Sequence, residues 1–264
     1  MKVNHWLRYS WLVCAVLFWY FMNRMLTKFL TNYLSQTFIN LPSAMHTLIV
    51  TVLIPYGFSM IILYLLIKPL VPYRFLAKKK MTFKELVNYS VVMNGIGMFI
   101  FLLFILGCRL IGVSIKQPLG DSMVSEWLMA LLLLLLNPIF EGILFRKLLL
   151  ERVPALPHLK QALLGGLLFA VPHFFSLGIV GGLRTFWLGI FLAYVTLNSR
   201  SLKYSAILHS ISNLYAYYLL TFLLDYPVLF FLFYFVGMPC WAFYLIQRYF
   251  KSAPSSEKDW ECKL

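Results

Sequence analysis

Long apolar segments recur along nearly the whole chain, and they limit its fold more than any other feature. A helix that crosses a membrane needs roughly 20 apolar residues. Eight segments meet this need, at about 6–23, 47–67, 88–111, 125–150, 161–177, 182–198, 204–223 and 227–247. Hydrophobic residues make up 61% of the chain and charged residues 12%, which excludes a soluble domain, a disordered chain and a disulfide scaffold. We therefore expect an all-α, polytopic transmembrane bundle.

The basic residues predict how this bundle is oriented. The net charge is +14, and Lys and Arg concentrate in the cytoplasmic segments of membrane proteins. If eight spans alternate, most basic residues fall on the side of both termini, which we therefore expect to be cytoplasmic. The charge then needs no nucleic-acid partner, and Lys78, Lys79 and Lys80 are expected to touch anionic lipid. We predict a single membrane domain over 1–264, a motif-bearing core at about 125–220 and a cytoplasmic tail over 248–264.

Few ionisable residues fall inside the predicted spans. Of the nine acidic residues only Glu141 cannot be placed in a loop, in a tail or at the end of a span, and of the five histidines only His173 and His209 fall within spans. Such a residue costs at least about 2.5 kcal/mol at the centre of a spanning helix. The three residues lie on three different predicted spans. Convergence on one cavity would let them satisfy each other, so we expect them to meet.

Other polar residues accompany these three. Asn213 lies four residues after His209, which places both on one helical face. Arg146 follows Glu141 by five residues, and the apolar run continues beyond it. We expect Arg146 to lie slightly below the membrane interface, held by a carboxylate or by snorkelling.

Two prolines lie beside the candidate polar residues. Pro138 precedes Glu141 and Pro172 precedes His173. A proline frees a backbone carbonyl, and inside a membrane this is tolerated where protein or trapped water repairs the loss. The prolines therefore favour a polar interior at these positions.

Three short segments match a known family pattern. They are 141–146 (EGILFR), 169–173 (FAVPH) and 209–213 (HSISN), and they follow one another on the fourth, fifth and seventh predicted spans. Together they resemble the motifs EExxxR, FxxxH and HxxxN of the CAAX protease and bacteriocin-processing family, CPBP, also called Abi. The motifs lie within about residues 125–220.

This resemblance implies a membrane-embedded endopeptidase that hydrolyses peptide or prenyl-peptide substrates. Glu141 would be the general base that activates water, while His173, His209 and Asn213 would complete the site and stabilise the oxyanion. Arg146 would support them. The resemblance also implies a multi-pass protein of a bacterial plasma membrane.

One residue departs from the family pattern, because Gly142 stands where the family has a second glutamate. Whatever that carboxylate does must be absent here or supplied by another group. No cofactor is required by the pattern. A divalent metal such as zinc is left open, because Glu141, His173 and His209 form a two-histidine, one-carboxylate set. A metal-free mechanism is favoured, because no HExxH pair places two ligands on one helix.

Other interpretations stay open beside the protease. Glu141 and Arg146 would form a structural ion pair, or His209 and Asn213 would serve as interhelical hydrogen-bonding residues. The alternative function is a non-catalytic protein for bacteriocin self-immunity or sensor regulation that binds a membrane partner. A transporter with a proton relay is disfavoured, because the sequence has no repeated halves. The sequence does not give the oligomeric state.

Overall fold

The fold is known from a computed structural model that describes residues 5–37, 42–72, 80–112, 126–153 and 156–252. These residues form helices and short connections, with no strand among them. The all-α architecture is therefore confirmed. Lys78, Lys79 and residues 253–264 of the predicted tail lie outside the described residues.

Helical elements follow one another along the whole described chain. They are α1 (His5–Thr37), α2 (Ser43–Leu48), η1 (Ile49–Phe58), α3 (Ser59–Ile67), α4 (Phe83–Leu110), α5 (Glu126–Leu131), η2 (Leu132–Leu136), α6 (Asn137–Glu141), η3 (Gly142–Leu149), η4 (Leu150–Arg152), α7 (His158–Ser199), α8 (Leu202–Asn213), η5 (Leu214–Leu219), α9 (Leu220–Leu224), α10 (Pro227–Phe231), η6 (Leu232–Gly237) and α11 (Met238–Ser252).

Several of these elements are turns of one longer helix. The segments η1, η2, η3, η5 and η6 are π-helical, η4 is 3₁₀-helical, and all of them continue the α-helices beside them. Two prolines lie close to a change of winding, Pro55 inside η1 and Pro138 at the second position of α6, which follows η2. Because proline cannot donate the backbone hydrogen bond of a regular α-helix, the ladder is rearranged near these positions.

Six helical stretches of the described chain are long and apolar enough to cross a membrane. They are Ala44–Ile67, Phe83–Leu110, Glu126–Arg152, His158–Ser199, Leu202–Leu224 and Pro227–Arg248. The protein is therefore a multi-pass membrane protein. The counts of eight and six differ in two places, because α1 is not among the six and one helix, α7, holds two of the predicted spans. The eight-span count and the cytoplasmic termini stay predictions.

Helix α1 is longer than the sequence predicted. The expected helix ended at 23, but α1 continues to Thr37 and carries Arg24 and Lys28 as exposed residues. Both charged residues therefore belong to this helix.

Helix α7 is bent back on itself at Gly178. This residue has φ 72° and ψ −175°, a conformation that glycine adopts without steric cost. A Cβ at Gly166 would lie 2.8 Å from the backbone nitrogen of Ile190, and one at Gly189 would lie 2.9 Å from Cδ1 of Phe169. The two halves of α7 are therefore antiparallel and closely packed. They coincide with the predicted segments 161–177 and 182–198.

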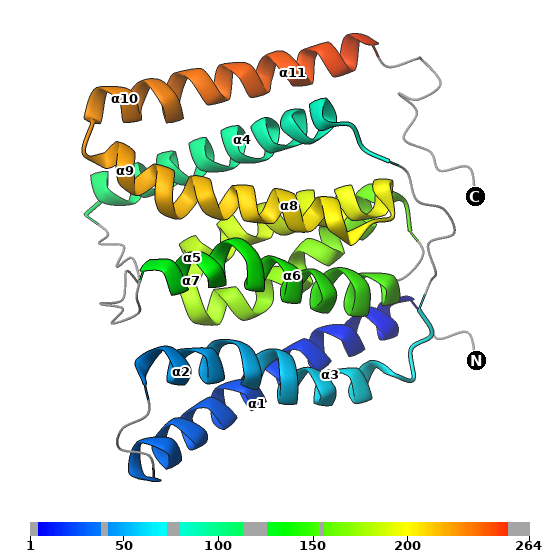
Figure 1. Ribbon diagram of the computed structural model, residues 1–264. Coiled ribbons are helices and arrows are strands. Elements are labelled where there is room, and N and C mark those ends of the chain that lie inside the picture. The colour runs from blue at the N-terminus through cyan, green and yellow to red at the C-terminus, as the bar shows by residue number, and fades with distance from the viewer. Residues whose placement is uncertain (1–4, 38–41, 73–79, 113–125, 154–155, 253–264) are drawn as a thin grey trace.

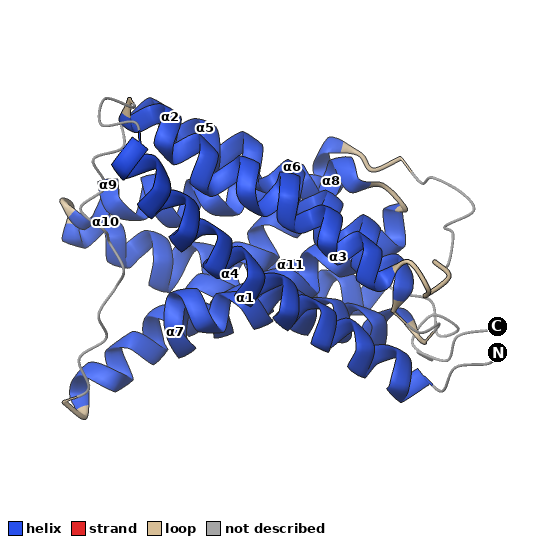
Figure 2. Cartoon of the chain, turned by 90° about the horizontal axis from the view of Figure 1, so that it is seen from below, coloured by secondary structure: helices blue, strands red, loops and turns tan. Residues whose placement is uncertain are grey.

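The helices form a bundle in which α6 and α8 lie in the middle. Figure 1 shows α11 and α4 along one side and α1 with α3 along the other. Helix α11 packs along α4, α1 packs against α3 and α7, and α8 contacts η2, α6, η3 and α7. The N-terminal end of α1 and the C-terminal end of α11 lie at the same end of the bundle in both views (Figures 1 and 2).

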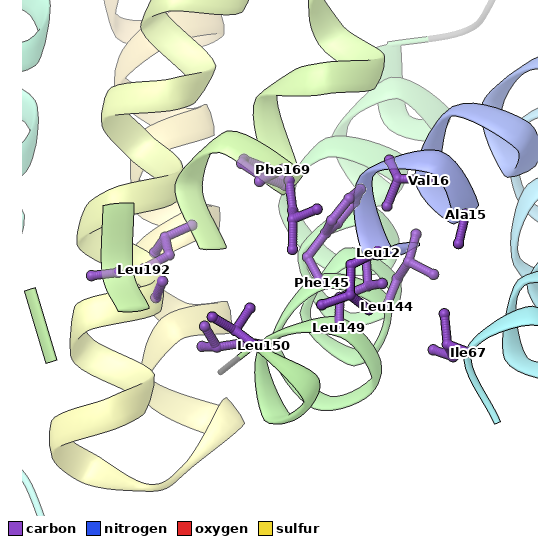
Figure 3. Packing of buried hydrophobic residues seen from close by; sticks show 14 of the residues in the cluster. Leu12, Ala15, Val16, Ile67, Leu144, Phe145, Leu149, Leu150, Phe169 and Leu192 are labelled. Atoms are coloured by element: carbon purple, nitrogen blue, oxygen red, sulfur yellow. The ribbon is translucent and has the colours of Figure 1, made fainter. Parts of the chain in front are cut away.

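A hydrophobic core connects α1, η3 and α7 and supports the middle of the bundle. Figure 3 shows Leu12 and Val16 of α1 facing Leu144, Phe145 and Leu149 of η3, with Phe169 of α7 next to Phe145 and Leu192 of α7 on the far side of Leu150. Leu12, Leu144, Leu149 and Leu192 are completely buried. Burial of one such leucine contributes roughly 1.5–3 kcal/mol where the alternative is water. In this protein the core mainly fixes η3, which carries Arg146, against α7, which carries His173.

Candidate active site

The centre of the candidate site is the pair formed by Glu141 and His209. Glu141 is the last residue of α6, and His209 lies in α8. Oε2 of Glu141 is 3.8 Å from Nε2 of His209, and the two side chains are only 14% and 6% exposed. The predicted convergence of these two residues is therefore present in the structure.

A tyrosine that sequence analysis did not single out also reaches Glu141. The hydroxyl group of Tyr56, in η1, donates to Oε1 of Glu141 over 3.4 Å. The ring of Tyr56 stacks on Phe140, with 4.9 Å between centroids and 12° between planes. One carboxylate oxygen therefore faces Tyr56 and the other faces His209. The only sequence signal was the proline at position 55, which marks an irregular helix here.

Phe169 brings the remaining candidate residues together. Its ring is 1% exposed, and its centroid lies 4.9 Å from that of His173 and 5.8 Å from that of His209. The guanidinium carbon of Arg146 lies 4.3 Å from the same centroid. Phe145 packs on the ring in a T-shaped arrangement, with 4.9 Å between centroids (Figure 3). The phenylalanine of the FxxxH pattern is thus the apolar surface against which both histidines and the arginine lie.

His173 is oriented by a hydrogen bond within its own helix. Its Nδ1 lies 2.8 Å from the backbone carbonyl oxygen of Phe169. Because a carbonyl oxygen only accepts, Nδ1 is the donor, and in the neutral ring Nε2 is left with a lone pair. In this tautomer His173 can accept a proton or hydrogen bond through Nε2. Donation to an oxyanion through Nε2 would require a protonated ring, and the expected role of His173 at the oxyanion stays a prediction.

Asn213 is joined to the helix that carries Glu141. Its Nδ2 donates to the backbone carbonyl oxygen of Leu133, in η2, over 2.7 Å. In η2 the N–H of Asn137 bonds to the carbonyl of Leu132, five residues earlier. The next donor in that register would be residue 138, which is a proline without an N–H. Asn213 therefore satisfies a carbonyl that Pro138 leaves unpaired, as the interhelical hydrogen-bond interpretation expected.

Arg146 lies deeper than the sequence suggested. It is 3% exposed, so it does not snorkel to an interface. Its Nη1 donates to the backbone carbonyl oxygen of Glu141 over 3.3 Å, and no carboxylate oxygen of the described residues forms an ion pair with it within 4.0 Å. Its Nη2 is buried without a hydrogen-bond partner in the described part of the chain. The expectations of an ion pair with Glu141 and of snorkelling are therefore both wrong.

The donor set does not form a metal centre in this structure. Across the described part of the chain, no three His, Cys, Asp or Glu side chains converge closely enough to hold a metal ion. Glu141 and His209 approach each other, whereas His173 is bonded to the backbone of its own helix. The arrangement at hand is therefore one carboxylate and one imidazole in a buried, largely apolar setting, with a tyrosine hydroxyl at the carboxylate.

The comparison with protein families is consistent with this geometry. Residues 123–215 match the family model described as Rce1-like, type II CAAX prenyl endopeptidase. The predicted family resemblance is confirmed over this segment. The Rce1-like segment contains Glu141, Arg146, His173, His209 and Asn213. No curated protein and no solved structure gave a match to the chain.

Within the Rce1-like segment, the candidate residues form two groups, and Asn213 lies apart from both. Glu141 and His209 face each other directly, with Tyr56 joining from outside the segment. His173 and Arg146 contact the ring of Phe169, which also touches His209. Asn213 is one helical turn beyond His209 and bonds to η2.

Proposed function

We propose that the protein is a membrane-embedded endopeptidase in which Glu141 activates a water molecule for attack on a peptide carbonyl. The observation that carries the proposal is the buried Glu141–His209 pair, with 3.8 Å between Oε2 and Nε2. The match of residues 123–215 to a family of prenyl endopeptidases supports this chemistry. One water between the two side chains would be within hydrogen-bonding reach of both.

The proposed reaction needs a group that first accepts a proton from water and later returns it, and Glu141 does both. Glu141 removes a proton from the water as its oxygen attacks the carbonyl carbon, which gives a tetrahedral intermediate. Glu141 then delivers that proton to the amine as the C–N bond breaks, and the products are a carboxylic acid and an amine. The hydroxyl group of Tyr56 holds one carboxylate oxygen in place, and His209 faces the other across the water. The low local polarity strengthens each of these interactions.

The substrate class follows from the family likeness rather than from the geometry. We propose a peptide or prenyl-peptide, or a membrane protein that presents such a segment, which reaches the site from the lipid bilayer. We also propose a bacterial plasma membrane as the location. No step in the reaction is routed through a metal ion.

Cleavage of prenylated and unprenylated peptides by purified protein in detergent tests the proposal. Replacement of Glu141 by Gln retains size and hydrogen bonding but removes the base, so cleavage should fall by a factor of at least about 100. Glu126→Gln, at an exposed residue at the start of α5, is the matched control and should cleave as the wild type does. Cleavage by Glu141→Gln at the wild-type rate would contradict the proposal.

The non-catalytic alternative makes a different prediction for the same proteins. A protein that only binds a membrane partner would cleave no peptide, and Glu141→Gln would leave its protective phenotype unchanged. The absence of the second family glutamate at Gly142 is the observation that favours this alternative. Loss of both peptide cleavage and protection in the folded Glu141→Gln protein would favour the endopeptidase.

A further inference from the structure

One nitrogen of a deeply buried guanidinium group has no partner among the described residues. Arg146 is 3% exposed, its Nη1 donates to a backbone carbonyl and its face lies on the ring of Phe169. Its Nη2 makes no hydrogen bond within the described part of the chain. Leaving a charged donor unpaired away from water is costly, and such groups in proteins are ordinarily paired or bound to a ligand. The unpaired nitrogen therefore indicates a missing acceptor.

Open space lies one helical turn before this arginine. Gly142 is buried, yet a Cβ built on it would meet no described atom within 4 Å. Other buried glycines of the protein differ, because a Cβ at Gly165 or Gly166 would come within 2.8 Å of a neighbouring atom. Close packing between helices therefore does not explain why residue 142 is a glycine. Residues four apart on a helix are neighbours on its surface, so a group placed beside Gly142 would be near Arg146.

We propose that Arg146 and the space beside Gly142 form a binding site for a carboxylate group. A carboxylate matches the unpaired guanidinium nitrogen in charge and geometry, and such charge-assisted bonds are among the strong ones. The carboxylate of Glu141 does not fill this role, since it faces His209 and Tyr56. The bound carboxylate lies next to the water-activating pair without replacing it.

This carboxylate has two chemical sources. One is the C-terminal carboxylate of a bound peptide, in which case Arg146 would select peptides that end close to the cleaved bond, and this version rests on the proposed function. The other is a small free carboxylate ion, which would occupy the site whether or not the protein cleaves peptides. Both sources use the same contacts with Arg146.

Thermal unfolding of the full-length protein in detergent tests the site itself. Sodium formate should raise the unfolding temperature of the wild type in a concentration-dependent manner, relative to sodium chloride at equal ionic strength. Gly142→Glu supplies a carboxylate from the chain, and Gly142→Gln fills the same space without charge. Both variants should lose the formate effect, and Gly142→Glu should unfold at a higher temperature than Gly142→Gln. A formate effect of equal size in all three proteins would overturn the proposal.

Peptide binding separates the two sources. Binding of one peptide with a free C-terminal carboxylate is compared with binding of its C-terminal amide, in the wild type and in Gly142→Glu. A preference for the acid of at least about tenfold, lost in Gly142→Glu, supports the peptide as the source. If formate raises the unfolding temperature but the peptide acid binds no better than its amide, the source is a free carboxylate ion. If neither the formate effect nor the preference is found, the site is refuted. Because these measurements record binding, they are independent of whether Glu141 catalyses cleavage.

Discussion

The side chain of Asn213 replaces the backbone donor that Pro138 cannot supply to the carbonyl group of Leu133. The 2.7 Å hydrogen bond joins α8 to the helix that carries Glu141. Since His209 lies one turn before Asn213 on α8, this bond also helps to fix the distance between Glu141 and His209. Asn213 thus has a structural role whose contribution to stability can be measured separately from catalysis.

Asn213→Ala should destabilise the protein by about 1 kcal/mol, because it leaves the partly buried carbonyl group of Leu133 unpaired. The control is the same substitution in a Pro138→Ala background, where residue 138 regains an N–H that can bond to this carbonyl. Asn213→Ala should then cost less. Unfolding measured for the two single variants and the double variant gives the coupling free energy. Equal costs in both backgrounds would show that Pro138 does not create the need for Asn213.

Tyr56→Phe should lower peptide cleavage by roughly tenfold or more, because it removes the donor to Oε1 of Glu141 and retains the ring that stacks on Phe140. The rate constant and the Michaelis constant, measured separately, should show the loss mainly in the rate constant. Tyr244→Phe, at an exposed residue of α11, is the control. An unchanged rate in Tyr56→Phe would mean that the hydroxyl group does not orient the carboxylate.

Phe169→Ala should destabilise the protein by about 3–5 kcal/mol, the usual cost of removing a buried phenylalanine ring. The ring contacts the side chains of His173, His209 and Arg146, so activity should fall even under conditions where the variant is folded. Phe243→Ala, at an exposed residue of α11, should change stability little. Thermal unfolding and cleavage of the two variants provide the comparison.

Gly166→Ala should destabilise the hairpin of α7 by about 1–3 kcal/mol, because the new Cβ would meet the backbone of Ile190. Gly107→Ala is the matched control in α4, where a Cβ meets no described atom within 4 Å. It should be neutral or stabilise the helix by up to about 1 kcal/mol. Unfolding of both variants in the same detergent distinguishes close packing from helix propensity. Equal effects would mean that the two halves of α7 are not closely packed.

The sequence predicted the features that depend on polarity and on strong helix breakers. The approach of Glu141 to His209 followed from the cost of isolated ionisable groups in a membrane. The reversal of α7 falls at Gly178, within the short segment 178–181 (GIVG) between the predicted spans 161–177 and 182–198. The family likeness, carried by three motifs in order, is confirmed over residues 123–215.

Other features depend on helical winding and on neighbours distant in sequence. The bond from Asn213 to Leu133 exists because η2 is π-helical, which an unbroken run of leucines does not reveal. Tyr56 is one of sixteen tyrosines, and only the fold brings it to Glu141. Arg146 is buried against the ring of Phe169, a contact that a charge count does not consider. Whether His173 and Asn213 act in catalysis stays a prediction.

The central claim is that Glu141 and His209 act as one unit on a water molecule. Single-turnover cleavage by Glu141→Gln, His209→Ala and the double variant tests it most directly, with folding of each protein verified by thermal unfolding. Residues that act as a unit are strongly non-additive, so the double variant should be about as slow as the slower single variant. The claim would be contradicted if the rate losses of the two single variants multiplied in the double variant. A wild-type cleavage rate in either single variant would also contradict it.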